Sequence, residues 1–261
     1  MKLHVATQHW LRFEHEGVPG FGTLEGDTIA RYRGEMFGAA EATGETVALG
    51  AVKLLPPTVP TKMICLWNNF AALGQKLGLA IPEEPLYLIK SSSSFITSGD
   101  TIRKPPFYDG RVIFEGELGI VIGKRCSGAD EAGAADAIFG YTCINDVTAF
   151  DLLQKDPSFP QWTRAKSFDT FGVFGPVVAT GLDPEALVIR AVLDGEERQS
   201  YPVSDMLIKP ARLVSLISRD MTLLPGDVIA CGTSIGTGKM KQGSTIEVSI
   251  EGIGTLHNHY E

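Results

Sequence analysis

The chain has 261 residues, of which 44% are hydrophobic and 21% are charged, a balance typical of a globular protein rather than a disordered one. The 23 Lys and Arg residues against 31 Asp and Glu residues give a net charge of −8, and without a basic block this argues against nucleic-acid binding. Every apolar run is shorter than the ~20 residues of a membrane span, and His, Arg and Glu interrupt the N-terminal stretch MKLHVATQHWLRFEHE. We therefore expect neither a membrane protein nor an N-terminal targeting peptide.

The cysteines point to a reducing compartment. None of the four forms a CxxC pair, and each stands among apolar or small residues: Cys65, Cys126, Cys143 and Cys231. We expect reduced thiols in the core of a cytoplasmic protein.

The first 55 or so residues predict short strands. The segment FGTLEGDTIARY predicts a hairpin that turns at Glu25-Gly26-Asp27. Prolines 56, 57 and 60 then stiffen an extended connection. This predicts a domain boundary near residue 57, with a small N-terminal domain over 1–57 and a larger domain over 58–261.

Strand signals dominate the larger domain. KMICLWNNF predicts a strand, and AALGQKLGLAIPEEP predicts a short helix ended by glycine and proline. Further strands are predicted for LYLIK, RVIFEGELGIVIG, FGVFGPVVAT, ALVIRAVLDG, DVIACGT and STIEVSIEG, and helices only for DEAGAADAIF, VTAFDLLQKD and PARLVSLISRDM. The 29 glycines and 15 prolines suit many tight turns, so the predicted fold class is α+β and rich in strands.

The histidines limit the possible chemistry, because all five lie near the ends of the chain: His4, His9, His15, His257 and His259. This excludes an HExxH motif, and it argues against a Ser-His-Asp or Cys-His site unless the termini fold back into it. Chemistry in the body of the protein must then rest on carboxylates, lysine, tyrosine and the backbone. Carboxylate sites favour hard cations such as Mg²⁺, Mn²⁺ or Ca²⁺ over zinc.

Two glutamates stand out in the predicted strand over residues 111–123. Because strand side chains alternate between faces, Glu115 and Glu117 share one face, about 7 Å apart at Cα. The other face is apolar and carries Val112, Phe114, Leu118, Ile120 and Ile122. The two carboxylates could converge on one cation, which would offset their mutual repulsion. The alternative is an exposed strand face that carries two glutamates.

A third carboxylate, Asp146, follows a predicted strand over residues 141–144 and precedes the helix predicted in VTAFDLLQKD. One interpretation is an ordinary helix N-cap. The other is a carboxylate at a strand end that points at the same ion as Glu115 and Glu117. The spacing alone does not choose between them.

The segments FEGELGIVIGKR, FGYTCINDVTAFDL, QWTRAKSFDTFGVFGP and LLPGDVIACGT resemble the fumarylacetoacetate hydrolase family in order and spacing, over roughly residues 58–261. The resemblance implies a mixed β-roll or β-sandwich catalytic domain, a homodimer, and Mg²⁺ or Mn²⁺ held by Glu115, Glu117 and Asp146. It also implies catalytic roles for Lys166 and Thr233. The N-terminal segment resembles the short domain that many bacterial members carry.

A site of this kind suits a 2-oxo or β-diketo acid. Three carboxylates leave part of the coordination shell of a divalent ion free for the keto and carboxylate oxygens of such a substrate, whose enolate the ion would stabilise. Lys166 would add a second positive group, although a solvated lysine is the alternative. Thr233 could bind the substrate carboxylate or be an ordinary turn residue. Further candidates for substrate contacts are Arg164, which could equally be a surface residue, and Asn69, Phe70 and Phe150.

The sequence departs from the family at the dyad that activates water in hydrolytic members, C-x-G-x-N-Y-x-x-H-x-x-E. Leu73 stands in place of the histidine and Lys76 in place of the glutamate, while Trp67 replaces a small residue and Phe150 an arginine. Leucine cannot accept a proton, so we favour a decarboxylase, isomerase or tautomerase. One alternative is an acylpyruvate-type C–C hydrolase that uses another base, such as Lys76 or a terminal histidine. A second alternative is a binding protein that keeps the metal site.

Overall fold

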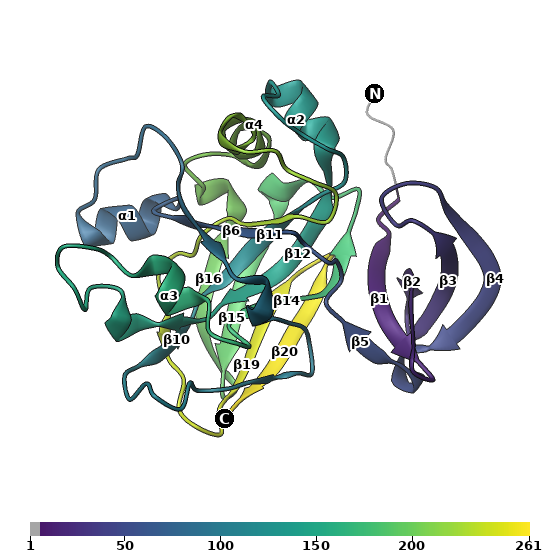
Figure 1. Cartoon of the computed structure of the whole chain (residues 1–261), viewed down its shortest axis with the longest axis horizontal. Coiled ribbons are helices and arrows are strands. Elements are labelled where there is room, and N and C mark those ends of the chain that lie inside the picture. The colour runs from purple at the N-terminus through teal and green to yellow at the C-terminus, as the bar shows by residue number, and fades with distance from the viewer. Residues whose placement is uncertain (1–5) are drawn as a thin grey trace.

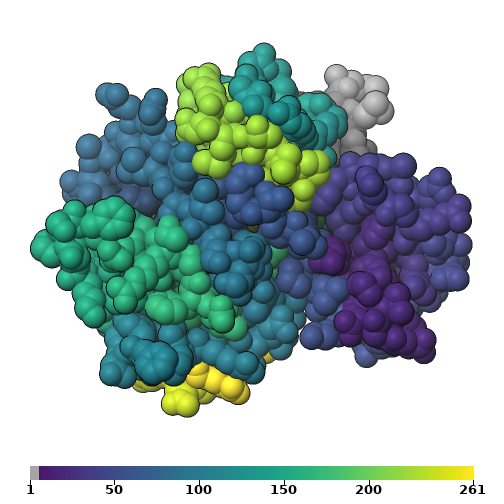
Figure 2. All heavy atoms as spheres, viewed as in Figure 1, coloured from purple at the N-terminus to yellow at the C-terminus, as the bar shows by residue number. Residues whose placement is uncertain are grey.

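A computed structural model of the chain describes residues 6–261 (Figure 1). The N-terminal strands form a lobe of their own, drawn in purple, which packs against a larger body that contains all four α-helices of the described residues (Figures 1 and 2). Strands far outnumber helices, and the predicted α+β fold class is confirmed.

The N-terminal lobe is an antiparallel meander in which each strand pairs with the next: β1 (His9–His15), β2 (Val18–Glu25), β3 (Thr28–Gly34) and β4 (Ala40–Ala48). A short fifth strand, β5 (Lys53–Leu55), returns to pair with β1. The predicted hairpin is confirmed, because β2 and β3 are joined at Gly26, whose φ of 57° is the left-handed conformation that glycine adopts readily.

The main sheet runs through both parts of the molecule in the order β4-β3-β2-β1-β14-β12-β11-β17-β6-β7, with β5 beside β1 and β8 beside β14. The strands not yet introduced are β6 (Met63–Trp67), β7 (Leu86–Lys90), β8 (Phe95–Ile96), β11 (Gly116–Ile122), β12 (Ile138–Asp146), β14 (Gly172–Ala179) and β17 (Val228–Ala230). The junction between lobe and body is the antiparallel pairing of β1 with β14.

Two smaller sheets complete the body. One has the order β16-β15-β19-β20-β9, built from β9 (Thr101–Ile102), β15 (Val188–Leu193), β16 (Glu196–Pro202), β19 (Thr245–Ile250) and β20 (Gly254–Tyr260). The other has the order β13-β10-β18, built from β10 (Val112–Phe114), β13 (Thr148–Ala149) and β18 (Gly238–Lys239).

The four helices are short and lie around the sheets: α1 (Ala71–Leu77), α2 (Glu131–Ala137), α3 (Trp162–Lys166) and α4 (Pro210–Asp220). In Figure 1, α2 and α4 lie together at the top and α1 and α3 on the left. Single 3-10 turns cover Leu49–Ala51, Ser92–Ser94, Phe150–Leu152, Pro184–Ala186 and Val203–Asp205. None of the helices in the described part of the chain has the length and apolar character needed to cross a bilayer.

The core explains the apolar pattern of residues 112–122. The predicted apolar face is confirmed, because Leu118 and the residues that alternate with it belong to one buried cluster with Ala191 and Val248 of the five-stranded sheet. Val121, on the opposite face of β11, belongs to a second buried cluster with Ile144 and Phe174. β11 is therefore buried on both faces. All four cysteines are buried and free, as predicted.

Three predicted elements need correction. Residues 111–123 are two strands, β10 and β11, and the chain passes from one sheet to another at Glu115. The helix predicted in VTAFDLLQKD is wrong: Thr148 pairs with Ile113 of β10, and only one 3-10 turn follows. The strand predicted over residues 141–144 extends to Asp146, so Asp146 ends a strand and caps no helix.

Candidate metal centre

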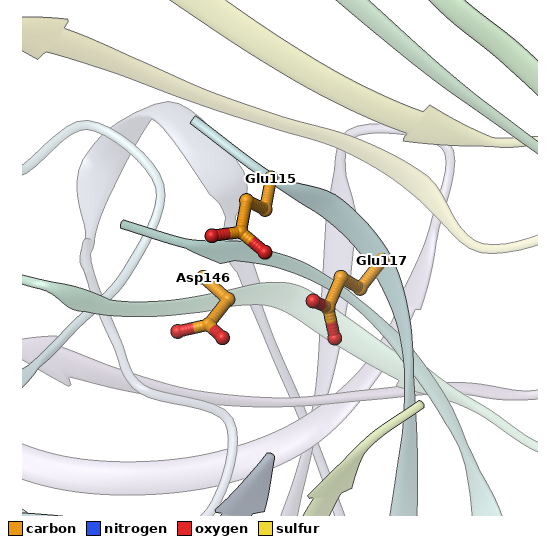
Figure 3. Close-up of side chains that lie close together, drawn as sticks. All are labelled: Glu115, Glu117 and Asp146. Atoms are coloured by element: carbon orange, nitrogen blue, oxygen red, sulfur yellow. The ribbon is translucent and has the colours of Figure 1, made fainter. Parts of the chain in front are cut away.

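The three predicted metal ligands come together through the register of two neighbouring strands. In the antiparallel pairing of β11 with β12, Gly116 lies opposite Asn145 and Glu117 opposite Ile144. One step further, the N–H of Asp146 donates to the carbonyl oxygen of Glu115 at 2.9 Å. The carboxylates of Glu115, Glu117 and Asp146 therefore lie on one side, with a ligand oxygen from each within 4.8 Å of the others (Figure 3).

These carboxylates are buried, so an exposed face with two glutamates is ruled out. Glu117 and Asp146 have no exposed surface, and Glu115 is 7% exposed. Glu117 accepts a hydrogen bond from the N–H of Gly232 at 2.8 Å through Oε2, while its Oε1 has no partner within residues 6–261. Burial and the neighbouring charges of Asp146 and Glu115 raise the pKa of Glu117 well above its usual range. Buried, mutually repelling oxygens with an unpaired acceptor fit a hard divalent cation.

Lys166 lies against the same carboxylates, so a solvated lysine is also ruled out. Its ammonium donates to Glu115 Oε1 at 2.9 Å and to Asp146 Oδ2 at 2.6 Å. A third bond runs to the hydroxyl of Thr148 at 2.7 Å. Burial by itself would lower the pKa of Lys166, but the surrounding carboxylates raise it above its ordinary value. Lys166 is therefore a buried cation in this structure.

Lys90 is a site residue that the sequence analysis missed. It ends β7 and donates to Asp146 Oδ1 and to the carbonyl oxygen of Val147, the latter at 3.2 Å. Its side chain is completely buried. The only signal in the sequence is a lysine at the end of the apolar run LYLIK. With Lys90, three carboxylates face two ammonium groups, which leaves one net negative charge when all are ionised.

Thr233 adjoins the cluster in the turn after β17. Its hydroxyl donates to the carbonyl oxygen of Gly116 at 3.1 Å and accepts from Nε2 of Gln199 at 2.9 Å. The preceding residue is Gly232, whose N–H binds Glu117 and whose φ of 90° favours glycine. The structure thus places Thr233 next to the three candidate metal ligands, with its hydroxyl bonded to the backbone of Gly116. Its catalytic and substrate-binding roles stay predictions.

Asn69 bonds to this turn, and the neighbouring Phe70 packs in the core. The Asn69 amide donates to the carbonyl oxygen of Cys231 at 3.0 Å and accepts from the N–H of Ile208 at 3.0 Å. Phe70 is fully buried and packs edge-to-face against Tyr201, with ring centroids 5.0 Å apart. Both side chains lie within the protein core, so a direct contact with substrate stays a prediction.

The structure does not bring Arg164 and Phe150 into the cluster. Arg164 is exposed on α3, two residues before Lys166. Phe150 is 40% exposed, and the guanidinium of Arg111 lies 4.5 Å from its ring centroid. Their contacts with substrate stay predictions.

The helix α1 carries Leu73, half-buried, and Lys76, exposed, at the two positions where the predicted family likeness implies a histidine and a glutamate. Trp67, at the end of β6, packs against Trp162 of α3, with ring centroids 5.1 Å apart. None of the histidines within residues 6–261 bonds to the three carboxylates, and His4 lies outside the described residues.

Comparison with known proteins assigns the chain to a family. Residues 62–260 match the family model described as the fumarylacetoacetate (FAA) hydrolase C-terminal domain. The chain belongs to the fumarylacetoacetate hydrolase family. Residues 8–57 match a second model, described as the Rv2993c-like N-terminal domain. The family likeness predicted from the sequence is confirmed.

Several similar members of the family carry the names of tautomerases or isomerases. The oxaloacetate tautomerase YisK of Bacillus subtilis is 33% identical, over 94% of this chain and 88% of the relative. The mitochondrial oxaloacetate tautomerase FAHD1 of Arabidopsis thaliana is 39% identical, over 74% and 87%. The crystal structure of a 5-carboxymethyl-2-hydroxymuconate delta-isomerase from Mycobacterium smegmatis has a TM-score of 0.89 and 38% identity, covering 97% of this chain and 98% of that one.

Proposed function

We propose that this protein is a divalent-metal-dependent tautomerase or isomerase of 2-oxo acids, with oxaloacetate as the first substrate to test. The observation that carries the proposal is the convergence of three buried carboxylates on one point beside the ammonium of Lys166. The names of the relatives support the same reaction class.

Glu115, Glu117 and Asp146 would hold Mg²⁺ or Mn²⁺, because their oxygens are hard ligands within reach of one another. When bound, the ion would supply Lewis-acid polarisation of the carbonyl group of a 2-oxo acid.

The protein's own contribution is a buried ammonium that is held by three hydrogen bonds. Lys166 is held in place by Glu115, Asp146 and Thr148, which together accept from all three of its N–H groups. It could donate to an enolate oxygen in exchange for one of these contacts, and its positive charge already lies beside the cluster. Since Lys166 is 3% exposed, little water screens its charge, and its attraction to a developing negative charge is stronger than it would be at the surface. Lys90 bonds the other oxygen of Asp146 and holds that carboxylate ionised and oriented.

Hydrolysis is the less supported reaction. It needs a base that activates water, and α1 offers Leu73 at the position of the usual histidine. Keto–enol exchange needs only stabilisation of the enolate and transfer of a proton between carbon and oxygen, and the buried ammonium serves the first of these needs.

The test is to follow the ultraviolet absorbance of enol oxaloacetate with purified protein and Mg²⁺ or Mn²⁺, with EDTA-treated protein as control. We expect the enol band to decay faster than in buffer without formation of pyruvate. Pyruvate and CO₂ would indicate a decarboxylase, and cleavage of an acylpyruvate to pyruvate and a carboxylic acid would indicate a hydrolase. Mn²⁺ binding without turnover on any of a panel of 2-oxo acids would contradict the proposal and favour a binding protein.

A further inference from the structure

Gly116, the residue between the two glutamates of the metal centre, is held by side chains from a different sheet. Its N–H donates to Oε1 of Gln199 at 2.9 Å, and its carbonyl oxygen accepts from the hydroxyl of Tyr201. Gln199 and Tyr201 lie two residues apart on β16 of the five-stranded sheet, and both are buried. The peptide units on either side of Gly116 are therefore fixed from outside the main sheet.

This support lies where the ordinary strand ladder is interrupted. The chain leaves the three-stranded sheet after Phe114 and enters the main sheet at Gly116, so Glu115 belongs to neither strand. The N–H of Glu115 bonds to the side chain of Asn145 at 3.1 Å rather than to a backbone carbonyl. Side chains thus fix the direction in which Glu115 leaves the backbone relative to Glu117.

Gln199 also reaches the turn that orients Glu117. Its Nε2 donates to the hydroxyl of Thr233 at 2.9 Å and to the carbonyl oxygen of Ser234 at 3.2 Å. The same turn supplies the N–H of Gly232 that binds the Glu117 carboxylate. One buried amide therefore connects the backbone between the two glutamates with the turn that holds one of them.

The space around Gly116 leaves little room for a side chain. A Cβ atom added there would lie 3.2 Å from Oε1 of Gln199 and 3.2 Å from the Cβ of Ala191. Because both neighbours are buried, a side chain at this position would push Gln199 away from its hydrogen bond.

We infer that Gln199 and Tyr201 are positioning residues that set the separation of the Glu115 and Glu117 carboxylates for a divalent cation. The inference rests on the proposed function, since it requires that the cluster binds a metal. Neither residue touches the carboxylates, so both act through Gly116 and the turn at residues 232–234. Residues that orient metal ligands in this way typically change metal affinity by about 10- to 100-fold when replaced.

The experiment compares Mn²⁺ binding by calorimetric titration in wild-type protein, Tyr201→Phe and Gln199→Met. Tyr201→Phe removes one hydroxyl and keeps the ring that packs on Phe70. The matched control is Ser200→Ala, because Ser200 lies between the two residues on β16 and is exposed. We expect both variants to bind Mn²⁺ at least about 10-fold more weakly and Ser200→Ala to bind it as wild type does.

If Gln199 and Tyr201 only stabilise the fold, their substitution will lower the melting temperature and leave the Mn²⁺ dissociation constant unchanged. That result in both variants overturns the inference. If Gln199→Met does not fold, Tyr201→Phe decides alone. Wild-type protein that fails to bind Mn²⁺ overturns the proposed function and this inference with it, whereas tight binding in the wild type and both variants overturns this inference only.

Discussion

Lys90 and Lys166 bond to different oxygens of the same carboxylate, that of Asp146. Lys90 donates to Oδ1 and Lys166 to Oδ2, and the Asp146 carboxylate has no exposed surface. Both oxygens of this predicted metal ligand are therefore already paired with an ammonium group. A cation that binds here must share or replace one of these contacts, so metal binding and lysine charge are coupled.

We predict that Lys90→Met destabilises the metal-free protein by about 3 kcal/mol or more, because it removes one partner of a fully buried ion pair. Added Mn²⁺ should restore more stability to this variant than to the wild type, because the ion replaces the lost positive charge. Melting curves with and without Mn²⁺ measure both effects. The control is Lys124→Met, which breaks the exposed pair with Asp136 and should change stability by less than about 1 kcal/mol. An equal Mn²⁺ effect in Lys90→Met and wild type would contradict the coupling.

We predict that Lys166→Met reduces the rate of enol decay by about 100-fold or more while Mn²⁺ binding is retained. The physical reason is that a single preorganised donor to a developing oxyanion is worth about this factor. Steady-state rates and a Mn²⁺ titration on the same preparation separate the two effects. Activity close to that of the wild type would show that Lys166 serves structure rather than chemistry.

We predict that the metal-free protein loses stability as the pH rises above the ordinary glutamate pKa of 4.5. Burial and the neighbouring carboxylates raise the pKa of Glu117, so the folded protein keeps a proton there that the unfolded chain has lost. Glu117→Gln should therefore melt higher than metal-free wild type at pH 8 and show no stabilisation by Mn²⁺. The exposed Glu84→Gln serves as control. A Mn²⁺-induced rise in melting temperature in Glu117→Gln would remove Glu117 from the ligand set.

We predict that Arg164→Met raises the KM for oxaloacetate several-fold and leaves kcat unchanged. Arg164 lies on α3 two residues before Lys166 but outside the carboxylate cluster, so a contact with a dicarboxylic substrate would be with its outer carboxylate and not with the reacting atoms. The exposed Arg125→Met controls for a loss of general positive charge. Identical KM values in the two variants would show that Arg164 makes no specific contact with the substrate.

The sequence could predict what depends on local pattern. Alternation placed Leu118, Ile120 and Ile122 on one face, and turn residues marked the β2–β3 hairpin. The family motifs identified Glu115, Glu117 and Asp146, which the structure brings together.

What the sequence could not predict depends on pairing between distant segments. Thr148 lies in a strand because Ile113 pairs with it, and this overrides the helical pattern of the following residues. Lys90 reaches the cluster because β7 lies beside β6 at the edge of the main sheet, and the only sequence signal of this is a lysine at the end of the apolar run LYLIK. Gln199 and Tyr201 come from another sheet altogether.

The pairing of β1 with β14 has a consequence for N-terminal truncation of this protein. β14 lies between β1 and β12, the strand that ends at Asp146, and Trp10 of β1 packs in one apolar cluster with Val178 of β14. A protein truncated to begin after residue 57 would expose the edge of β14 and the apolar side chains that pack against Trp10. Exposed strand edges tend to pair with other chains. We therefore expect the shorter fragment to aggregate, and β1 to stabilise the body by covering the edge of β14.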